Sequence, residues 1–251
     1  MKGKPVKNLL LAVFMALAGG SVRAEEINVA VAANFTEAAT EIAAAFQAAT
    51  GHRALLSFGS TGQLFTQITQ NAPFDVFLAA DSARPARAVK EGLAVAGTNF
   101  TYAIGKLVLW SADPGLVTDE TVLSADGFTR IALANPETAP YGAAAVEVMR
   151  NLGVHDRLEP KFVRGNSIAQ TYQFVATGNA ELGFVALSQL AGRTEGSAWI
   201  VPDDLYAPIR QDAVLLNDGA GNPAAQAFVG FLKGPEAAAI IARYGYGTDA
   251  G

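Results

Sequence analysis

The segment 59–62, Gly-Ser-Thr-Gly, has a composition and setting that suit the binding of an anion. The alternating run 54–58 predicts a strand before it, and apolar residues at helical spacing over 64–68 predict a helix after it. A loop that ends at a helix N-terminus presents unpaired backbone N–H groups and the positive end of the helix dipole. The hydroxyl groups of Ser60 and Thr61 lie beside them. A serine before a helix is more often a simple N-cap, so this segment alone does not identify a binding site.

Similar polar turns follow three other predicted strands. They are Asn34 after the strand 27–33, the turn 140–142 (Pro-Tyr-Gly) after 131–135, and the turn 166–168 (Asn-Ser-Ile) after 161–163. In parallel α/β sheets, ligands collect beyond the carboxyl ends of the strands. If two lobes face each other, all four helix N-termini can point into one cleft and hold an anion with uncharged groups.

The order of the predicted elements indicates an α/β fold with two lobes. Each lobe is expected to be a mainly parallel sheet flanked by helices, because strands and helices alternate along the chain. Two long strands, 102–111 and 207–216, are expected to cross between the lobes as a hinge. This organisation predicts lobe I at 25–105 plus 212–251 and lobe II at 106–211.

The first 24 residues have the pattern of a cleavable signal peptide. Three lysines precede an apolar run over 9–18, and Val22-Arg23-Ala24 supplies small residues at the −3 and −1 positions. Cleavage after Ala24 leaves 227 residues. It removes four of the 18 basic residues and none of the 23 acidic residues, so the formal net charge falls from −5 to −9.

Charge and cysteine content exclude several classes of function. A net charge of −9 without a basic cluster disfavours nucleic acid as a partner. The chain has no cysteine, which rules out disulfides, thiolate metal sites and cysteine nucleophiles. No apolar run of 18 or more residues follows the leader. We therefore expect an exported protein in a Gram-negative periplasm.

Taken together, six segments of the chain resemble the periplasmic molybdate-binding proteins of ABC importers, which have a type II periplasmic-binding-protein fold. The resemblance extends over essentially the whole mature chain. The segments are VAANFT (31–36), SFGSTGQL (57–64), APFDVFLAAD (72–81), NPETAPYG (135–142), ELGFV (181–185) and FLKGPEAA (231–238).

The resemblance implies a ligand site and a cargo. It places Asn34 and Ser60 at the lobe I ligand positions, each giving a backbone N–H and a side-chain group, and Tyr141 and Ile168 where lobe II gives backbone N–H groups. The cargo would be molybdate or tungstate, with molybdenum held as the oxyanion and no direct metal ligand or cofactor. The implied protein is a monomer that is not an enzyme and delivers its cargo to a membrane permease.

One position departs from the family pattern. Many members carry a ligand tyrosine just after the strand that matches 182–185, and this chain has Ala186 there. Tyr141 is the natural substitute for the missing hydroxyl. Nearby Thr61 and Ala33 are second choices as ligand residues.

Carriers of other tetrahedral oxyanions, such as sulfate, thiosulfate or phosphate, remain an alternative. Uncharged donors suit a fully ionised dianion, whereas monohydrogen phosphate needs an acceptor for its proton, and the four turns contain no carboxylate. The choice of molybdate and tungstate over sulfate depends on cavity size.

A serine-dependent hydrolase is the main alternative from another class. Ser60 could serve as a nucleophile, but Gly-x-Ser-x-Gly is absent and the two histidines, His52 and His155, lie away from the four turns. Asp75 and Asp81 flank one strand like a carboxylate pair, although separate turn and cap roles fit their spacing better.

Paired tyrosines also occur in carriers of ferric iron. Tyr244 and Tyr246 form such a pair near the C-terminus, where a packing role is the simpler interpretation.

Overall fold

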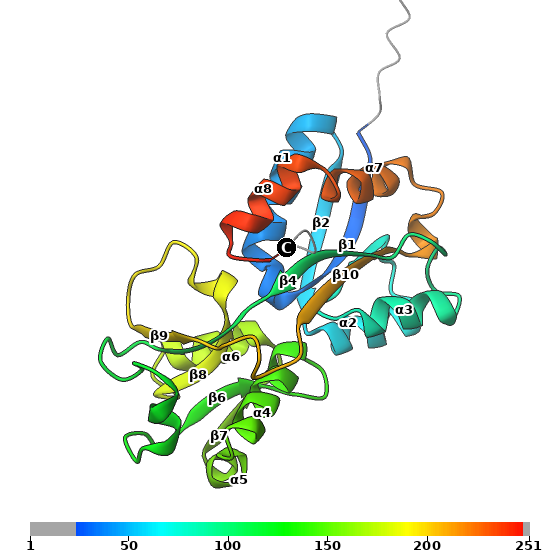
Figure 1. Cartoon of the computed structure of the whole chain (residues 1–251). Coiled ribbons are helices and arrows are strands. Elements are labelled where there is room, and N and C mark those ends of the chain that lie inside the picture. The colour runs from blue at the N-terminus through cyan, green and yellow to red at the C-terminus, as the bar shows by residue number, and fades with distance from the viewer. Residues whose placement is uncertain (1–23, 248–251) are drawn as a thin grey trace, which may run out of the picture.

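The computed structural model describes residues 24–247 and contains two five-stranded sheets, one in each lobe (Figure 1). The strand order in the first sheet is β2-β1-β3-β10-β4. Its strands are β1 (Glu26–Ala32), β2 (Arg53–Gly59), β3 (Val76–Leu78), β4 (Phe100–Gly105) and β10 (Ile209–Leu215). The order in the second sheet is β7-β6-β8-β5-β9. Its strands are β5 (Leu107–Ser111), β6 (Ile131–Ala134), β7 (Phe162–Gly165), β8 (Leu182–Ala186) and β9 (Ser197–Ile200).

Helices cover both faces of the first sheet. They are α1 (Thr36–Thr50), α2 (Thr61–Thr69), α3 (Ala83–Lys90), α7 (Pro223–Leu232) and α8 (Pro235–Arg243). Alternate residues of β1 divide between two cores: Val29 packs in the core that contains Phe46 of α1 and Phe228 of α7, and Ala30 packs in the core that contains Leu64 of α2. Because both faces are covered, the second half of β1, 29–32, is buried and apolar on both sides, whereas Glu26 and Asn28 at its start are exposed.

The second sheet is covered in the same way. Its helices are α4 (Pro140–Asn151), the short α5 (His155–Leu158) and α6 (Ile168–Ala176). Leu109 of β5 packs in the core that contains Val148 of α4, whereas Trp110 packs in the core that contains Val175 of α6. Five 3-10 turns complete the described elements: η1 (Ala33–Phe35), η2 (Glu120–Ser124), η3 (Glu159–Lys161), η4 (Leu187–Leu190) and η5 (Asn217–Gly219).

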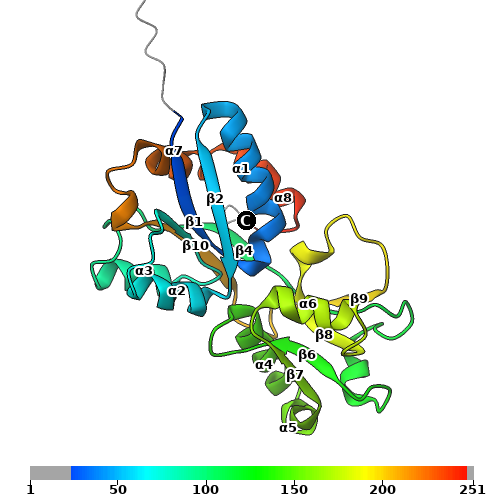
Figure 2. The same cartoon turned by 180° about the vertical axis from the view of Figure 1, so that it is seen from behind.

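Two segments connect the lobes, as the view from behind also shows (Figure 2). The predicted strand 102–111 is split at Lys106, because its first half pairs in the first sheet as β4 and its second half pairs in the second sheet as β5. The predicted strand 207–216 begins only at Ile209, after Pro208, whose ring nitrogen cannot donate a ladder hydrogen bond.

The two-lobed α/β fold is confirmed, and both sheets are mixed. In the first sheet β10 runs antiparallel to β3 and β4, and in the second β5 runs antiparallel to β8 and β9, so one strand of five opposes the others in each. Strand β9 was not predicted. The predicted signal peptide, 1–24, lies outside the described residues except for Ala24, and no helix within 24–247 has the length and apolar character needed to span a bilayer.

Candidate functional site

All four residues predicted to bind the ligand line one small cavity between the lobes. Asn34 and Ser60 reach it from the first lobe, and Tyr141 and Ile168 reach it from the second. The cavity is completed by small or uncharged residues, namely Ala32, Ala33, Thr61, Ala80, Ala139 and Pro140. The convergence follows from topology, because each of these turns stands at the carboxyl end of a strand and the two sheets present those ends to each other.

Ser60 is both an N-cap and a cavity residue. It follows β2 and caps α2 in a capping box. Its Oγ accepts from the N–H of Gln63, and its own N–H donates to Gln63 Oε1, both at 3.4 Å. The hydroxyl hydrogen of Ser60 has no acceptor among residues 24–247. Thr61 Oγ1 accepts from the N–H of Ala80 at 3.0 Å, which ties the start of α2 to the end of β3. The cap therefore holds the serine in place while its hydroxyl hydrogen stays free to donate.

The side chain of Asn34 is occupied by other protein groups. Its Nδ2 donates to Gln211 Oε1 at 2.8 Å and to the hydroxyl of Tyr246 at 3.0 Å, so both amide hydrogens are used. The backbone carbonyl oxygen of Asn34 accepts from Ser188 Oγ at 2.9 Å. The donor that Asn34 retains is its backbone N–H, whereas the family resemblance implied a side-chain group as well.

Tyr141 and Ile168 stand in the first turns of α4 and α6. Neither backbone N–H has an acceptor in the described part of the chain, as is normal for the first turn of a helix. The Tyr141 side chain is buried, and its hydroxyl oxygen accepts from Gln211 Nε2 at 3.1 Å. Each helix thus offers one N–H group, and Tyr141 places a hydroxyl beside the crossing strands.

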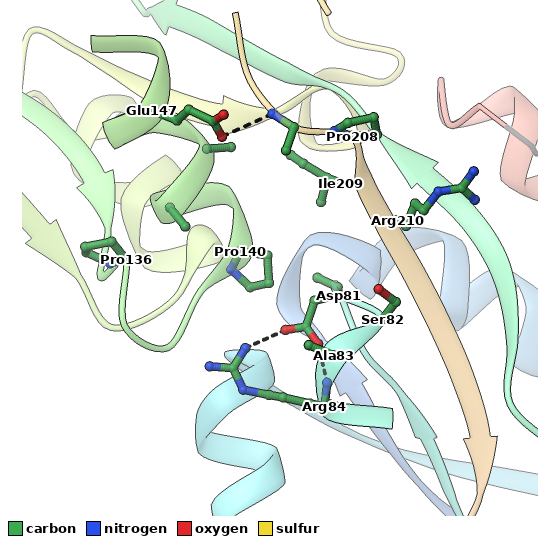
Figure 3. Close-up of a pocket in the computed structure, with 14 residues that line it drawn as sticks. Asp81, Ser82, Ala83, Arg84, Pro136, Pro140, Glu147, Pro208, Ile209 and Arg210 are labelled. Carbon is green, nitrogen blue, oxygen red and sulfur yellow. Dashed lines mark hydrogen bonds and ion pairs between the residues drawn. The ribbon is translucent and has the colours of Figure 1, made fainter. Parts of the chain in front are cut away.

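Direct contacts between the lobes surround the cavity. The N–H of Gly62 donates to the carbonyl of Thr138 at 2.8 Å, and Arg84 Nη2 donates to the carbonyl of Glu137 at 2.9 Å. Asp81 holds Arg84 in this position through a salt bridge (Figure 3). On another side of the cavity, Ser188 donates across the lobes to the backbone of Asn34. The two lobes are therefore in contact in this structure.

A wider pocket of about 300 Å³ lies next to the small cavity. Figure 3 shows the residues that line it. Ala80 and Pro140 line both spaces, so they form the partition between them. The wider pocket contains charged side chains, but these have partners: Asp81 pairs with Arg84, and Glu147 accepts from the N–H of Ala207 at 3.1 Å.

The residues considered for other functions have local structural contacts. His52 stacks on Phe46 and accepts from the N–H of Glu25 at 3.2 Å, and His155 pairs with the adjacent Asp156. Among residues 24–247, no three histidine, cysteine, aspartate or glutamate side chains are grouped so that they could hold a metal ion.

The two aspartates that flank β3 also serve separate contacts. Asp75 Oδ2 accepts from the N–H of Asn28 at 2.7 Å, and Asp81 Oδ1 accepts from the N–H of Arg84 at 2.8 Å near the start of α3. They do not form a carboxylate pair.

Gln211 and Ser188 lie at this site although they were not predicted there, and Tyr246 was predicted to have only a packing role. Tyr246 is buried, and its hydroxyl donates to the carbonyl of Asn34 at 2.8 Å. Gln211 is fully buried in β10 between Arg210 and Asp212. Three consecutive polar residues in a strand give no signal of which side chain is buried, so these partners could only be found in the folded chain.

The buried tyrosines predict a loss of stability at alkaline pH. Burial raises the pKa of Tyr102, Tyr141 and Tyr246 above the ordinary tyrosine value. The unfolded chain therefore loses these protons first, from about pH 10, and each tyrosine should lower the free energy of unfolding by about 1.4 kcal/mol per pH unit above that. Urea unfolding between pH 8.5 and 11 measures the slope. Tyr246→Phe should make it shallower, and an unchanged slope would contradict this assignment.

Comparison with known proteins extends these observations. The family model described as bacterial extracellular solute-binding protein matches residues 27–247. The chain belongs to this family. This solute-binding protein is 58% identical over 226 residues to the molybdate-binding protein ModA of Rhodobacter capsulatus, with 90% of each chain covered. It is 55% identical to the molybdate-binding protein ModA of Azotobacter vinelandii, with 97% of this chain and 98% of the relative covered.

A solved structure shares the whole fold. The periplasmic molybdate-binding protein of Azotobacter vinelandii superposes on this solute-binding protein with a TM-score of 0.86 at 42% identity. The match covers 88% of this chain and 99% of that one.

Proposed function

We propose that this solute-binding protein captures molybdate, and also tungstate, between its two lobes and delivers it to the permease of an ABC importer. The observation that carries the proposal is the convergence of four turns, two from each lobe, on one cavity whose lining has no charged side chain. The molybdate-binding relatives at 58% and 55% identity support the choice of cargo. The protein is a transport component and not an enzyme.

The proposed ligand groups are donors on both lobes. Ser60 would give its hydroxyl, Asn34, Tyr141 and Ile168 would give backbone N–H groups, and the oxyanion would be held through its oxygens without direct contact between molybdenum and protein. Removing a dianion from water is costly, so nearly every oxygen must find a donor. No cofactor takes part.

Capture would proceed by closure of the lobes. The oxyanion would first bind to the lobe I turns, and rotation about β10 and the β4–β5 connection would then bring the α4 and α6 N-termini onto it. We propose the limits 25–105 with 212–251 for lobe I and 106–211 for lobe II. The closed monomer would act in the periplasm after cleavage of residues 1–24 and would dock on its permease in this form.

Calorimetry on residues 25–251 tests the function. Molybdate and tungstate should each bind at one site per chain, whereas phosphate should bind far more weakly because the cavity lining offers no carboxylate for its proton. The affinity for sulfate distinguishes a molybdate carrier from a carrier of another tetrahedral oxyanion. Tight sulfate binding without molybdate binding would assign the protein to another oxyanion.

A single substitution tests the hydroxyl donor. Ser60→Ala should weaken molybdate binding by at least about tenfold, because the loss of one buried donor to an anion costs on the order of 1–3 kcal/mol. The change also removes an N-cap. Asn222→Ala is the matched control, since Asn222 caps α7 through the N–H of Ala224 at 2.9 Å and lies outside the cavity. It should lower stability and leave affinity unchanged. Unchanged affinity in Ser60→Ala would remove this residue from the site.

A further inference from the structure

Gln211 is a buried polar residue on the hinge strand that the proposed ligand set does not include. Its exposed fraction is 0%, and it lies on β10, which connects the lobes. The register of β10 against β4 shifts between Gln211 and Asp212, so that Tyr102 of β4 has no residue opposite it. The extra residue belongs to β4, so the bulge bends β4 and changes the direction of its side chains next to Gln211.

The amide of Gln211 joins residues from both lobes. Its Oε1 accepts from Asn34 Nδ2 at 2.8 Å and from the hydroxyl of Tyr102 at 3.2 Å. Its Nε2 donates to the hydroxyl oxygen of Tyr141 at 3.1 Å. One side chain thus connects a cavity residue of the first lobe, Asn34, to a cavity residue of the second, Tyr141.

These contacts fix which way the amide points. The Tyr246 hydroxyl donates to the backbone carbonyl of Asn34, so its oxygen needs a donor and the Nδ2 group of Asn34 faces it. The same Nδ2 group faces Gln211, so the oxygen of Gln211 must face Asn34 and its NH₂ group must face Tyr141. The oxygen of Tyr141 is then the acceptor, and the hydroxyl hydrogen has no acceptor among residues 24–247. A hydroxyl whose oxygen already accepts a hydrogen bond becomes a stronger donor of its own hydrogen.

The backbone at Gly105 leaves room for the contact between Tyr141 and Gln211. A Cβ built on Gly105, the last residue of β4, would lie 2.1 Å from the Tyr141 hydroxyl oxygen and 2.6 Å from Gln211 Nε2. The space that a side chain would occupy at this position therefore holds the contact between the tyrosine and the glutamine.

We propose that Gln211 is a positioning residue of the oxyanion site, which orients the Tyr141 hydroxyl so that its hydrogen is donated to the anion and couples that donor to Asn34 on the opposite lobe. The inference rests on the proposed function. It assigns to the Tyr141 hydroxyl a direct contact with the anion, and it adds the residue that sets the polarity of that contact.

A double-mutant cycle on molybdate affinity tests the coupling. The variants are Gln211→Met, which keeps the length of the side chain and removes its hydrogen bonds, Tyr141→Phe, and the two combined. Each single change should weaken binding by about tenfold or more. The double variant should be no weaker than the weaker single variant, because Gln211 acts through the hydroxyl that Tyr141→Phe removes. Gln47→Met, at an exposed position of α1, is the control and should bind as the unaltered protein does.

A purely structural role for Gln211 predicts a different cycle. Gln211→Met would then lower molybdate affinity as much in the Tyr141→Phe background as in the unaltered protein. Such additivity would overturn the proposal. Unchanged affinity in either single variant would also overturn it. Tyr141→Phe alone is sufficient for this if Gln211→Met does not fold. If the proposed function itself is wrong, the unaltered protein should bind neither molybdate nor tungstate.

Discussion

Replacing Gly142 by alanine should lower the free energy of unfolding by about 3 kcal/mol and weaken molybdate binding by at least about tenfold. A Cβ at this position would lie 2.1 Å from the carbonyl oxygen of Ala134 and 2.7 Å from its carbonyl carbon. These are backbone atoms at the end of β6, so no side-chain rotation can relieve the contact. The first turn of α4 would have to move away from the strand and would carry the N–H of Tyr141 with it.

Urea unfolding and calorimetry measure the two effects of Gly142→Ala. Gly230→Ala is the matched control: this glycine lies in α7, its Cβ would meet nothing within 4 Å, and alanine favours a helix by up to about 1 kcal/mol. Its stability should stay level or rise. A Gly142→Ala protein as stable as the control variant would mean that α4 is not held against β6 as closely as the structure has it.

Gly62→Ala should have opposite effects on stability and on binding. The N–H of Gly62 donates across the lobes to the carbonyl of Thr138, and a Cβ at Gly62 would lie 2.9 Å from Thr138 Cα. Alanine would therefore keep the lobes from closing fully and move the Tyr141 and Ile168 N–H groups away from the anion. Since each lost donor costs on the order of 1–3 kcal/mol, we expect molybdate affinity to fall by about a hundredfold.

Without ligand, the Gly62→Ala protein should be at least as stable as the unaltered one. Gly62 lies in the first turn of α2, where alanine is the better helix former, and the clash exists only when the lobes are together. Small-angle scattering with saturating molybdate should show a larger radius of gyration for the variant than for the unaltered protein. Full compaction with normal affinity would show that the lobes tolerate a methyl group at this contact.

The sequence was sufficient to predict which four turns meet at one cavity between the lobes. Apolar runs such as 27–33 have the length and burial of central strands, and a polar or glycine-containing turn after each one marks a helix start. These are local signals, and each of Asn34, Ser60, Tyr141 and Ile168 belongs to one of them.

What the sequence could not give are the contacts between distant segments. Gln211 and Asn34 are 177 positions apart and form a hydrogen bond, and the amide hydrogens of Asn34 are used up by this contact and by Tyr246. The split of the hinge strand at Lys106 has the same origin, since the local pattern is continuous and only the pairing partners differ. Strand β10 reads as an ordinary strand, but its direction depends on the chain that returns from the second lobe.

The uncharged lining of the small cavity bears on how a bound anion is released. No carboxylate, imidazole, ammonium or guanidinium group borders it in the part of the chain that the structure describes, so no proton movement near neutral pH can switch its hold on an anion. We therefore expect release of a captured ion to depend on separation of the two lobes and not on pH. The free energy for separating the lobes would then come from a partner that binds both of them.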